Sequence, residues 1–534
     1  MKFEEIKLIF KKTHTSQRSN YVLDMCCPTI VQVTNCCPGQ FIALKIPKCV
    51  YVEELDTILK IDSSQIVFSY VNLTTGKTVK AFGSESNGSI FICIETDNIE
   101  KVNHLCIKKI SIRVEPACLK QLSGCITLDN LGKIVEVKPK FRWVKLGPDI
   151  DGDAADDLSG FSVSMNIDGT RVAIGAIYND ENGSNSGQTR VYCFNGSTWT
   201  KVGPDINGEA IDDLSGYSVS LNADGTRVAI GARDNDGNGS LSGHIRVYEF
   251  DGSYWIQLGL DIDGEAINNQ SGFSVSLNGD GTIVAIGAPF NDGNGSNSGQ
   301  TRVFKYNGFA WNKLGPDIYG QTTFDQSGSS ISLNADGTRV AIGAPFNDGN
   351  GTQSGQTRIF EYKGSDWIKL GEDIYGEAMF DRSGGSVSLN GDGTIVAIGA
   401  IGNDENGLNS GHTRVYEFNG SAWNPLGSDI DGEASNDQSG FSVSLNADGT
   451  RVAIGARGND ENGSLSGKTR VYEFNGSAWN PLGQDIDGEA INDQSGYSVS
   501  LSADGTRVAI GAPDNDGNGS NSGHTRVYEL RCIV

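Results

Sequence analysis

Long apolar runs are missing from this sequence. No stretch approaches the roughly 18 consecutive apolar residues that a transmembrane helix needs, so no membrane span is expected. The first twenty residues, MKFEEIKLIFKKTHTSQRSN, carry charges inside their only apolar stretch, which is untypical of a secretory signal peptide. We therefore expect synthesis in the cytoplasm and no export by that route.

Motifs for catalysis are missing as well. The sequence has neither a G-x-S-x-G nucleophile elbow nor an H-E-x-x-H zinc motif. The segment GSLSGKT at 463–469 is one residue short of a phosphate-binding loop, and its counterparts read GSNSGQT. His244, His412 and His524 share one repeat position that Gln or Lys occupies elsewhere, which predicts a tolerated surface site. These observations predict a protein that is not an enzyme.

Basic residues are scarce beyond residue 142. The first 142 residues hold 19 Lys and Arg against 14 Asp and Glu, whereas the remainder holds 23 against 52. An acidic surface repels the phosphate backbone, so nucleic acid is not expected as a partner of the C-terminal part. The charge favours either a solvated, soluble surface or the attraction of cations or a basic partner.

Cysteine is scarce in the same C-terminal part, because nine of the eleven cysteines precede residue 126. The vicinal pairs at 26–27 and 36–37, each followed by Pro, lack the C-x2-C spacing of a zinc site. Disulfide bonds in an oxidising setting and buried reduced thiols both stay open. The nine are Cys26, Cys27, Cys36, Cys37, Cys49, Cys93, Cys106, Cys118 and Cys125.

Tryptophan occurs only in a repeat, where it marks the period. Seven units of 56 residues fill residues 143–534, and each contains one Trp. Four strand signals recur in each unit, which in the first are W-x-x-L-G, FSVSMN, TRVAIGA and TRVYCFNGS. Glycines in N-x-D-G-T and N-G-S supply the positive φ of tight turns between them. Four-stranded antiparallel sheets at a fixed period predict an all-β, seven-bladed β-propeller.

Residues 271–308 show the repeat most fully, with Gly-Phe-Ser-Val at 272–275, Gly-Ala-Pro at 287–289 and Gly-x-x-x-Val-Phe at 299–304. This pattern resembles the FG-GAP repeat of integrin α-chain propellers and of many bacterial and viral surface proteins. The resemblance implies that the serine-rich strand is innermost and the Trp strand outermost. Since the chain enters the repeats on an outer strand, we expect residues 143–147 to close the last blade.

The region before the repeats predicts a separate domain. Residues 1–20 are polar and charged and are expected to form a flexible arm. Runs such as FIALKI and SIFICIE alternate with turn residues over 21–142, which predicts a small Cys-rich, sandwich-like β domain. We expect this domain to attach the propeller at 143–534 to a larger assembly.

The long loops of each unit are expected on one face of the propeller, because antiparallel blades send alternate connections to opposite faces. Their aspartates predict an acidic rim around the channel mouth. One set is Asp149, Asp205, Asp261, Asp317, Asp373, Asp429 and Asp485. The other is Asp180, Asp236, Asp292, Asp348, Asp404, Asp460 and Asp516.

Calcium is the one cofactor that the loops suggest. The resemblance places an ion between the first two blade strands, but N-x-D-G-T is too short to hold one there. Asp292, Asn294 and Ser296 instead offer oxygens at the alternate spacing that hard cations use, although no distal Glu follows. The alternative is that these residues cap their own turns. The candidate ligands are Asp180, Asp236, Asp292, Asn294, Ser296, Asp348, Asp404, Asp460 and Asp516.

Two further repeat positions predict structural roles. An Arg recurs in the last strand signal, and a buried charge needs partners, which favours an ion pair or hydrogen bond between blades. Each Trp is expected to anchor the core beside its outer strand. The arginines are Arg190, Arg246, Arg302, Arg358, Arg414, Arg470 and Arg526. The tryptophans are Trp143, Trp199, Trp255, Trp311, Trp367, Trp423 and Trp479.

Near-identical units repeat one surface, whereas catalysis usually needs a single asymmetric cluster. We therefore expect a structural or interaction protein whose acidic face binds a protein or a glycan. The N-terminal cysteines and near-identical duplications favour location on a virus particle. A cell-surface adhesin is the alternative, and a polysaccharide-degrading enzyme is a further one.

Overall fold

The computed structural model divides into two compact units, Phe141–Arg531 and residues 1–140 with 532–534. It describes residues 141–531 in full and, in the rest of the chain, strand positions only. The predicted arm, the sandwich-like domain and its nine cysteines lie outside the fully described residues. Strands of the first unit form the antiparallel sheets β1-β2-β9, β3-β8-β7-β6, β4-β5 and β10-β11. They are β1 (Ile9–Thr13), β2 (Asn20–Asp24), β3 (Phe41–Pro47), β4 (Cys49–Val52), β5 (Thr57–Lys60), β6 (Phe68–Val71), β7 (Thr78–Ser86), β8 (Ser89–Glu95), β9 (Ile110–Arg113), β10 (Thr127–Leu128) and β11 (Ile134–Glu136).

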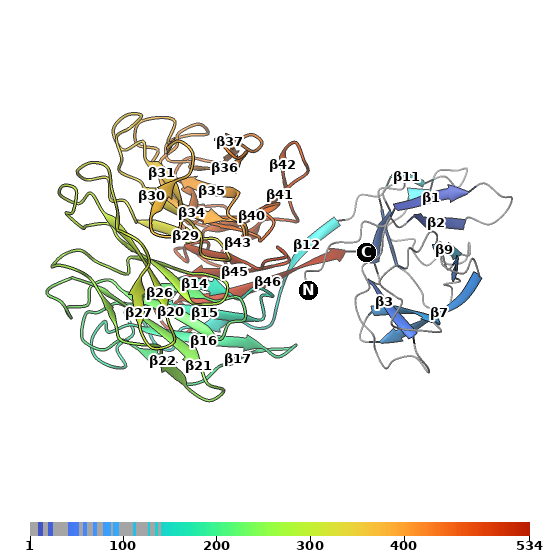
Figure 1. Cartoon of the computed structure of the whole chain (residues 1–534), viewed down its shortest axis with the longest axis horizontal. Coiled ribbons are helices and arrows are strands. Elements are labelled where there is room, and N and C mark those ends of the chain that lie inside the picture. The colour runs from blue at the N-terminus through green and yellow to red at the C-terminus, as the bar shows by residue number, and fades with distance from the viewer. Residues whose placement is uncertain are drawn as a thin grey trace. The chain divides into compact units, whose positions relative to one another are not determined.

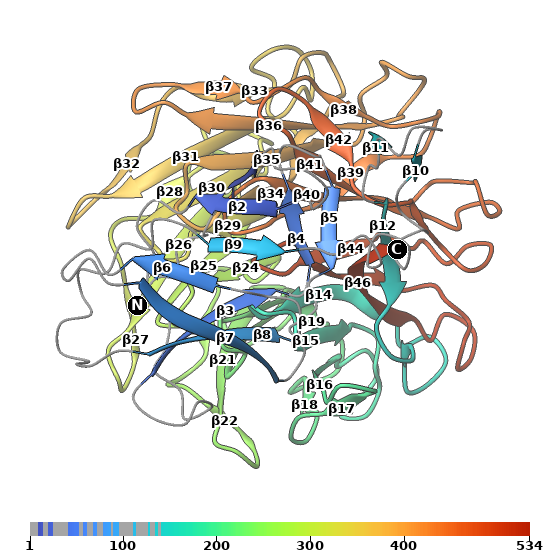
Figure 2. The ribbon, with the colours of Figure 1, turned by 90° about the vertical axis from the view of Figure 1, so that its right-hand side faces the viewer.

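The second unit is a ring of seven antiparallel blades, as the sequence predicts. Chain colour runs around this ring from green through yellow and orange to red (Figures 1 and 2). The first strands of successive blades contact one another and are innermost, and we number the blades one to seven by them. They are β14 (Ser159–Met165), β19 (Ser215–Leu221), β24 (Ser274–Leu277), β29 (Ser330–Leu333), β34 (Ser383–Leu389), β39 (Ser439–Leu445) and β44 (Ser498–Leu501).

The second strand of each blade has the sequence RVAIGA or IVAIGA, and the third begins the Arg-containing signal. The second strands are β15 (Arg171–Ala176), β20 (Arg227–Ala232), β25 (Ile283–Ala288), β30 (Arg339–Ala344), β35 (Ile395–Ala400), β40 (Arg451–Ala456) and β45 (Arg507–Ala512). The third are β16 (Gln188–Phe194), β21 (His244–Phe250), β26 (Gln300–Tyr306), β31 (Gln356–Tyr362), β36 (His412–Phe418), β41 (Lys468–Phe474) and β46 (His524–Ile533).

The outer strand is broken into two pieces, both paired with the third strand. In blade one, Phe194 pairs with Trp199, and Gln188 at the other end of β16 pairs with Asn207. The Trp pieces are β12 (Lys140–Lys145), β17 (Trp199–Lys201), β22 (Trp255–Gln257), β27 (Trp311–Lys313), β32 (Trp367–Lys369), β37 (Trp423–Pro425) and β42 (Trp479–Pro481). The second pieces are β13 (Ile150–Asp151), β18 (Ile206–Asn207), β23 (Ile262–Asp263), β28 (Ile318–Tyr319), β33 (Ile374–Tyr375), β38 (Ile430–Asp431) and β43 (Ile486–Asp487).

The ring closes in blade seven, where β12 and β13 pair with β46. The interface that closes the ring is held by the same tryptophan hydrogen bond as the other six interfaces between blades. Trp143 Nε1 donates to the Leu482 carbonyl at 2.8 Å, just as Trp199 Nε1 donates to the Leu146 carbonyl at 2.7 Å. Each Trp is thus held by the blade before it, because a buried indole N–H needs an acceptor.

The hydrophobic core lies between blades. Val340 and Ile342 of β30 face blade three, where they pack on Ile283 and Val303. Ala341, between them, faces blade five and packs beside Val387. Because successive side chains of a strand point to opposite faces, V-A-I presents large residues to one neighbour and a small one to the other. Stacking seven blades therefore buries a hydrophobic cluster at each of the seven interfaces.

Near the channel, glycine and serine let adjacent blades approach closely. A Cβ on Gly175 would lie 2.1 Å from the Gly216 carbonyl oxygen of the next blade, so only glycine fits there. Ser162 Oγ donates to that carbonyl at 2.7 Å. Among the residues that the structure describes, no helix is long and apolar enough to cross a bilayer.

Candidate functional site

The two long loops of each blade form one rim of the propeller, which we call the loop rim. It comprises residues 177–187 and 208–214 and their counterparts 56 residues apart. Loops of neighbouring blades are joined by backbone hydrogen bonds, for example from Asp212 N to the Ser184 oxygen at 2.8 Å. All described non-glycine residues with positive φ lie here, Asp156, Leu158 and Asn185 in the closing and first blades among them. Such backbone persists only where its surroundings fix it, so the rim has a defined shape.

The predicted calcium ligands lie on this rim and are exposed, but their carboxylates have partners in their own turns. Asp292 Oδ1 accepts from the Asn297 amide at 2.8 Å, and the equivalent bond of 2.7–2.8 Å is present in all seven blades. Asn294 Nδ2 donates to the Gly320 carbonyl at 2.8 Å, and the Ser296 carbonyl accepts from Phe324 N at 2.8 Å. This geometry fits turn capping and loop joining. Calcium binding by these residues stays a prediction.

The other predicted set, that of Asp149, does not line the channel mouth. These aspartates lie between the two pieces of the outer strand, on the side of the blade away from the channel. Four of them pair with a Lys four residues earlier, as Asp205 does with Lys201 at 2.7 Å. The prediction that this set contributes to an acidic rim around the channel mouth is therefore wrong.

The position of the three histidines is buried, not superficial. It is the first residue of each third strand, and we call it the ring position. His244, His412 and His524 are exposed by 2% or less there. The second piece of the outer strand covers them, since His412 pairs with Asp431 of β38. The prediction of a surface site is wrong, because the strand pieces that cover this position, such as β38 (Ile430–Asp431), are too short to give a signal in the sequence. The ring position is occupied by Gln188, His244, Gln300, Gln356, His412, Lys468 and His524.

The seven arginines bind the preceding blade beside this position, which confirms the structural prediction. Each Nη2 donates, at 2.6–3.0 Å, to a carbonyl in the second piece of the preceding outer strand. Arg414 also pairs with Glu377 at 3.2 Å. Burial without these partners would be costly for a guanidinium.

Acidic side chains gather around the ring position. Within residues 141–531, four groups of His, Asp or Glu have ligand atoms within 4.8 Å of one another. They are Glu377, Glu405, His412 and Asp429; Asp149, Glu489 and His524; Glu209, His244 and Asp261; and Glu433, Glu461 and Asp485. The sequence signals that could have found them are the Gln, His or Lys variation and the Glu in N-D-E-N-G.

Blade six fills its acidic group with a lysine. Lys468 is 1% exposed, and its Nζ donates to Glu433 at 2.8 Å, to Glu461 and to Asp485 at 3.3 Å. Burial alone would lower the pKa of Lys468, but the hydrogen bonds from its ammonium to Glu433 and Glu461 raise it above the ordinary value. Its positive charge is therefore fixed in place.

Blade five surrounds a histidine with the same acids. Burial and the neighbouring Arg414 lower the pKa of His412 to about 4, so the imidazole is neutral at pH 7. Burial and the nearby Glu377 raise the pKa of Asp429 to about 6. Like charges crowded in a partly buried site disfavour ionisation. The acids of blade five thus lack the cation that those of blade six possess.

An arc of aromatic rings follows the inner ends of the blades at the loop rim. Neighbouring centroids are 4.8–5.0 Å apart in the order Phe441, Tyr497, Phe161, Tyr217 and Phe273. The two remaining blades have Ser329 and Gly385 at this position. The arc is therefore interrupted at blades four and five.

The same two blades expose apolar side chains on the rim, which we call the apolar sector. Phe324, Met379 and Phe380 are 57%, 61% and 53% exposed. Blades one and two have Asp156 and Asp212 at the positions of the two phenylalanines. Exposed apolar groups gathered on a polar rim mark an interaction surface.

Comparisons with known proteins identify the repeat. The FG-GAP repeat family matches residues 149–194, 262–304 and 486–528. No curated protein matches the sequence. Among solved structures, hydrazine synthase of Kuenenia stuttgartiensis matches with a TM-score of 0.45 and 12% identity, over 73% of this chain and 98% of that chain. The FG-GAP fold is typical of non-enzymatic interaction proteins. The chain is therefore a seven-bladed β-propeller that contains FG-GAP repeats in three places.

Proposed function

We propose that this protein is a non-enzymatic interaction protein whose loop rim binds a protein or glycan partner. The observation that carries the proposal is the apolar sector of Phe324, Met379 and Phe380. Natural interfaces bury apolar anchors of this kind against the partner and surround them with a polar margin. Phe324 and Phe380 depart from the repeat, because the other five units have Asp or Asn at their position, whereas the position of Met379 carries an exposed Ile in three other units.

The charge of the rim supports a basic partner surface. The long loops are rich in Asp and Glu, and their basic residues are Arg233, Arg382 and Arg457. Complementary charge steers association and is screened by salt. Binding through this rim is accordingly expected to weaken as ionic strength rises.

Arrays of glycans and of cell-surface proteins, probed with the full-length protein, test this proposal. The informative variant is Phe324→Asp with Phe380→Asp, which copies Asp156 and Asp212 at matching positive φ of 64–69°. Because the backbone there already accommodates Asp, folding should be retained. Removing two central aromatic anchors is expected to weaken binding by about 100-fold, at roughly 1–2 kcal/mol each.

A matched control removes an exposed aromatic from the opposite rim. Phe309 is 88% exposed in the turn where most other blades have Ser, so Phe309→Ser is the variant. It should leave binding unchanged. Equal binding by wild type and the double variant would place the contact elsewhere, and release of product from a bound polysaccharide would favour an enzyme instead.

The proposal extends to attachment through the N-terminal unit and to location on a virus particle, with a cell surface as the alternative. The division of the chain into two compact units supports separate roles for display and attachment. Mass spectrometry of purified particles and of host membranes from the native source tests it. Recovery of the protein from neither fraction would contradict it.

A further inference from the structure

We propose that Glu377, Glu405, His412 and Asp429 form a binding site for one divalent transition-metal cation. These residues come from three loops and one strand end of neighbouring blades. Glu377 precedes β34, Glu405 precedes β36, His412 begins β36 and Asp429 precedes β38. Glu405 lies in the Asp404 turn and Glu377 in the loop of the apolar sector, but the site uses other side chains than either and does not rest on the proposed function.

The ligand atoms are close enough for one ion to join them. All four lie within 4.8 Å of one another, and His412 Nδ1 is 3.9 Å from Asp429 Oδ2. Tetrahedral bonds of about 2.0–2.2 Å place ligands about 3.4 Å apart, so modest closure is needed. Glu377 and Glu405 are exposed and can make that movement, and they leave a path from solvent.

His412 supplies independent evidence that a ligand belongs here. Its side chain is 0% exposed, yet neither ring nitrogen has a hydrogen-bond partner among residues 141–531. A buried polar group without a partner is costly. Asp431, which pairs with His412 across β36 and β38, likewise has a buried Oδ1 without a partner in that range. A cation bound by the imidazole would satisfy the first of these groups directly.

Blade six shows that a cation fits this arrangement. Glu433, Glu461 and Asp485 are the counterparts of Glu377, Glu405 and Asp429, and they surround the ammonium of Lys468. Replacing Lys by a neutral His removes one positive charge and adds a metal-binding nitrogen. Blade six therefore shows that three acids in this arrangement can surround one cation.

The remaining blades lack the full set. Gln188 donates to Glu181 at 2.8 Å and so satisfies the acid without a cation. His244 and His524 lie beside two carboxylates each, because Gly237 and Gly517 stand where blade five has Glu405. Blade five alone among the seven combines a histidine with three carboxylates at this place.

The donor set selects the class of metal. Imidazole with carboxylates suits zinc, cobalt, iron or nickel, whereas calcium and magnesium prefer oxygen alone. A bound cation should therefore depend on His412 and not merely on the acids. This dependence distinguishes the proposed site from non-specific attraction to an acidic rim.

Titration of the full-length protein with Co²⁺, followed by visible d–d absorption and calorimetry, tests the site. His412→Gln is the key variant, because Gln occupies the same position in three other blades and is compatible with the fold. Cysteines elsewhere in the chain are common to wild type and all variants, so the difference in cobalt binding between wild type and variant reports on this site alone. We expect one Co²⁺ to be lost, with affinity reduced more than the roughly 10–100-fold cost of losing an outer-shell partner.

Two exchanges between blades sharpen the test. His412→Lys should abolish cobalt binding at the site and raise the melting temperature without metal, as its ammonium takes the place of the ion. Lys468→His should add a second cobalt equivalent, since it recreates the blade-five set in blade six. Identical spectra and affinities for wild type and His412→Gln would overturn the proposal. So would Ca²⁺ binding that exceeds Co²⁺ binding and ignores His412.

Discussion

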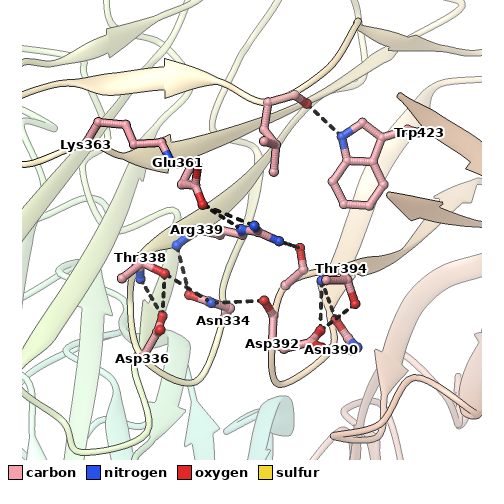
Figure 3. Close-up of polar contacts among 12 residues, drawn as sticks. Asn334, Asp336, Thr338, Arg339, Glu361, Lys363, Asn390, Asp392, Thr394 and Trp423 are labelled. Carbon is pink, nitrogen blue, oxygen red and sulfur yellow. Dashed lines mark hydrogen bonds and ion pairs between the residues drawn. The ribbon is translucent and has the colours of Figure 1, made fainter. Parts of the chain in front are cut away.

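The two rims of the propeller are built from the same strands and both contain aspartates that cap their own turns, but the loop rim and the outer strand beside it also contain crowded carboxylates. On the turn rim (residues 166–170, 195–198 and their counterparts), Asp336 Oδ1 accepts from Thr338 N and Oγ1 at 2.9 and 2.6 Å. Figure 3 shows this turn beside the equivalent one of Asp392, with Arg339 between them. Burial opposes ionisation of Asp336, but the Thr338 hydrogen bonds outweigh it and lower its pKa.

In the loop rim and in the outer strand beside it, burial raises the pKa of several aspartates, and neighbouring carboxylates add to the effect. They are Asp151, Asp234, Asp429, Asp487 and Asp514. The turn-rim acids are therefore satisfied by their own turns and serve the fold. The crowded acids in and beside the loop rim retain capacity for a cation or a partner.

The largest test of this contrast removes the lysine that blade six places among its acids. Lys468→Gln leaves Glu433, Glu461 and Asp485 without their ammonium, and Gln matches three other blades. We expect the unfolding free energy to fall by about 2 kcal/mol, less than for a fully buried pair because the carboxylates reach solvent. Tryptophan fluorescence in urea measures it, because every Trp lies in the propeller.

The control for that variant lies on the turn rim. Lys363 pairs with Glu361 but is 60% exposed, so Lys363→Gln is expected to change the unfolding free energy by less than about 0.5 kcal/mol. Equal effects of the two substitutions would erase the distinction between the rims.

A smaller test uses pH, because the two rims should respond with opposite sign. The folded-state pKa of Asp336 is lowered, so its stabilisation is present above its unfolded pKa of about 3.9 and is lost as pH falls through the folded value. Asp336→Ala should cost about 1 kcal/mol at pH 7, with a smaller difference at pH 3. Asp514 has a raised pKa, so its charge disfavours folding at pH 7. Asp514→Asn should therefore leave stability unchanged or increase it at pH 7.

Urea unfolding of both variants at pH 7 and pH 3, with fluorescence detection, measures these differences. The contrary outcome is that Asp514→Asn loses as much stability at pH 7 as Asp336→Ala. The surroundings of Asp514 would then favour its charged form as much as those of Asp336 do, and the contrast between the two rims would fail.

The sequence predicts the ring far better than the site. The 56-residue spacing of Trp143 and its counterparts gives the blade count, and the four strand signals of each unit predict its four-stranded sheet. Ile206 and Asn207 form a strand too short for any periodicity to reveal, and that strand buries the ring position. The grouping of Glu377 with His412 depends on loops of adjacent blades, and no local pattern encodes such contacts. The burial of His412 could therefore be seen only in three dimensions.

The smallest test asks whether the loop-rim aspartates that cap turns also hold calcium. Asp292→Asn keeps an oxygen for the Asn297 amide but removes the charge that a hard cation needs. If Asp292 only caps its turn, the substitution should cost less than about 0.5 kcal/mol, and millimolar Ca²⁺ should shift the melting temperatures of wild type and variant equally. Asp292→Ala, which removes the acceptor, should cost about 1 kcal/mol with or without the ion. A calcium-induced rise in melting temperature that wild type shows and Asp292→Asn lacks would instead make the turn a calcium site. Because the same turn recurs in every blade, cation binding by the loop rim would then not be confined to blade five.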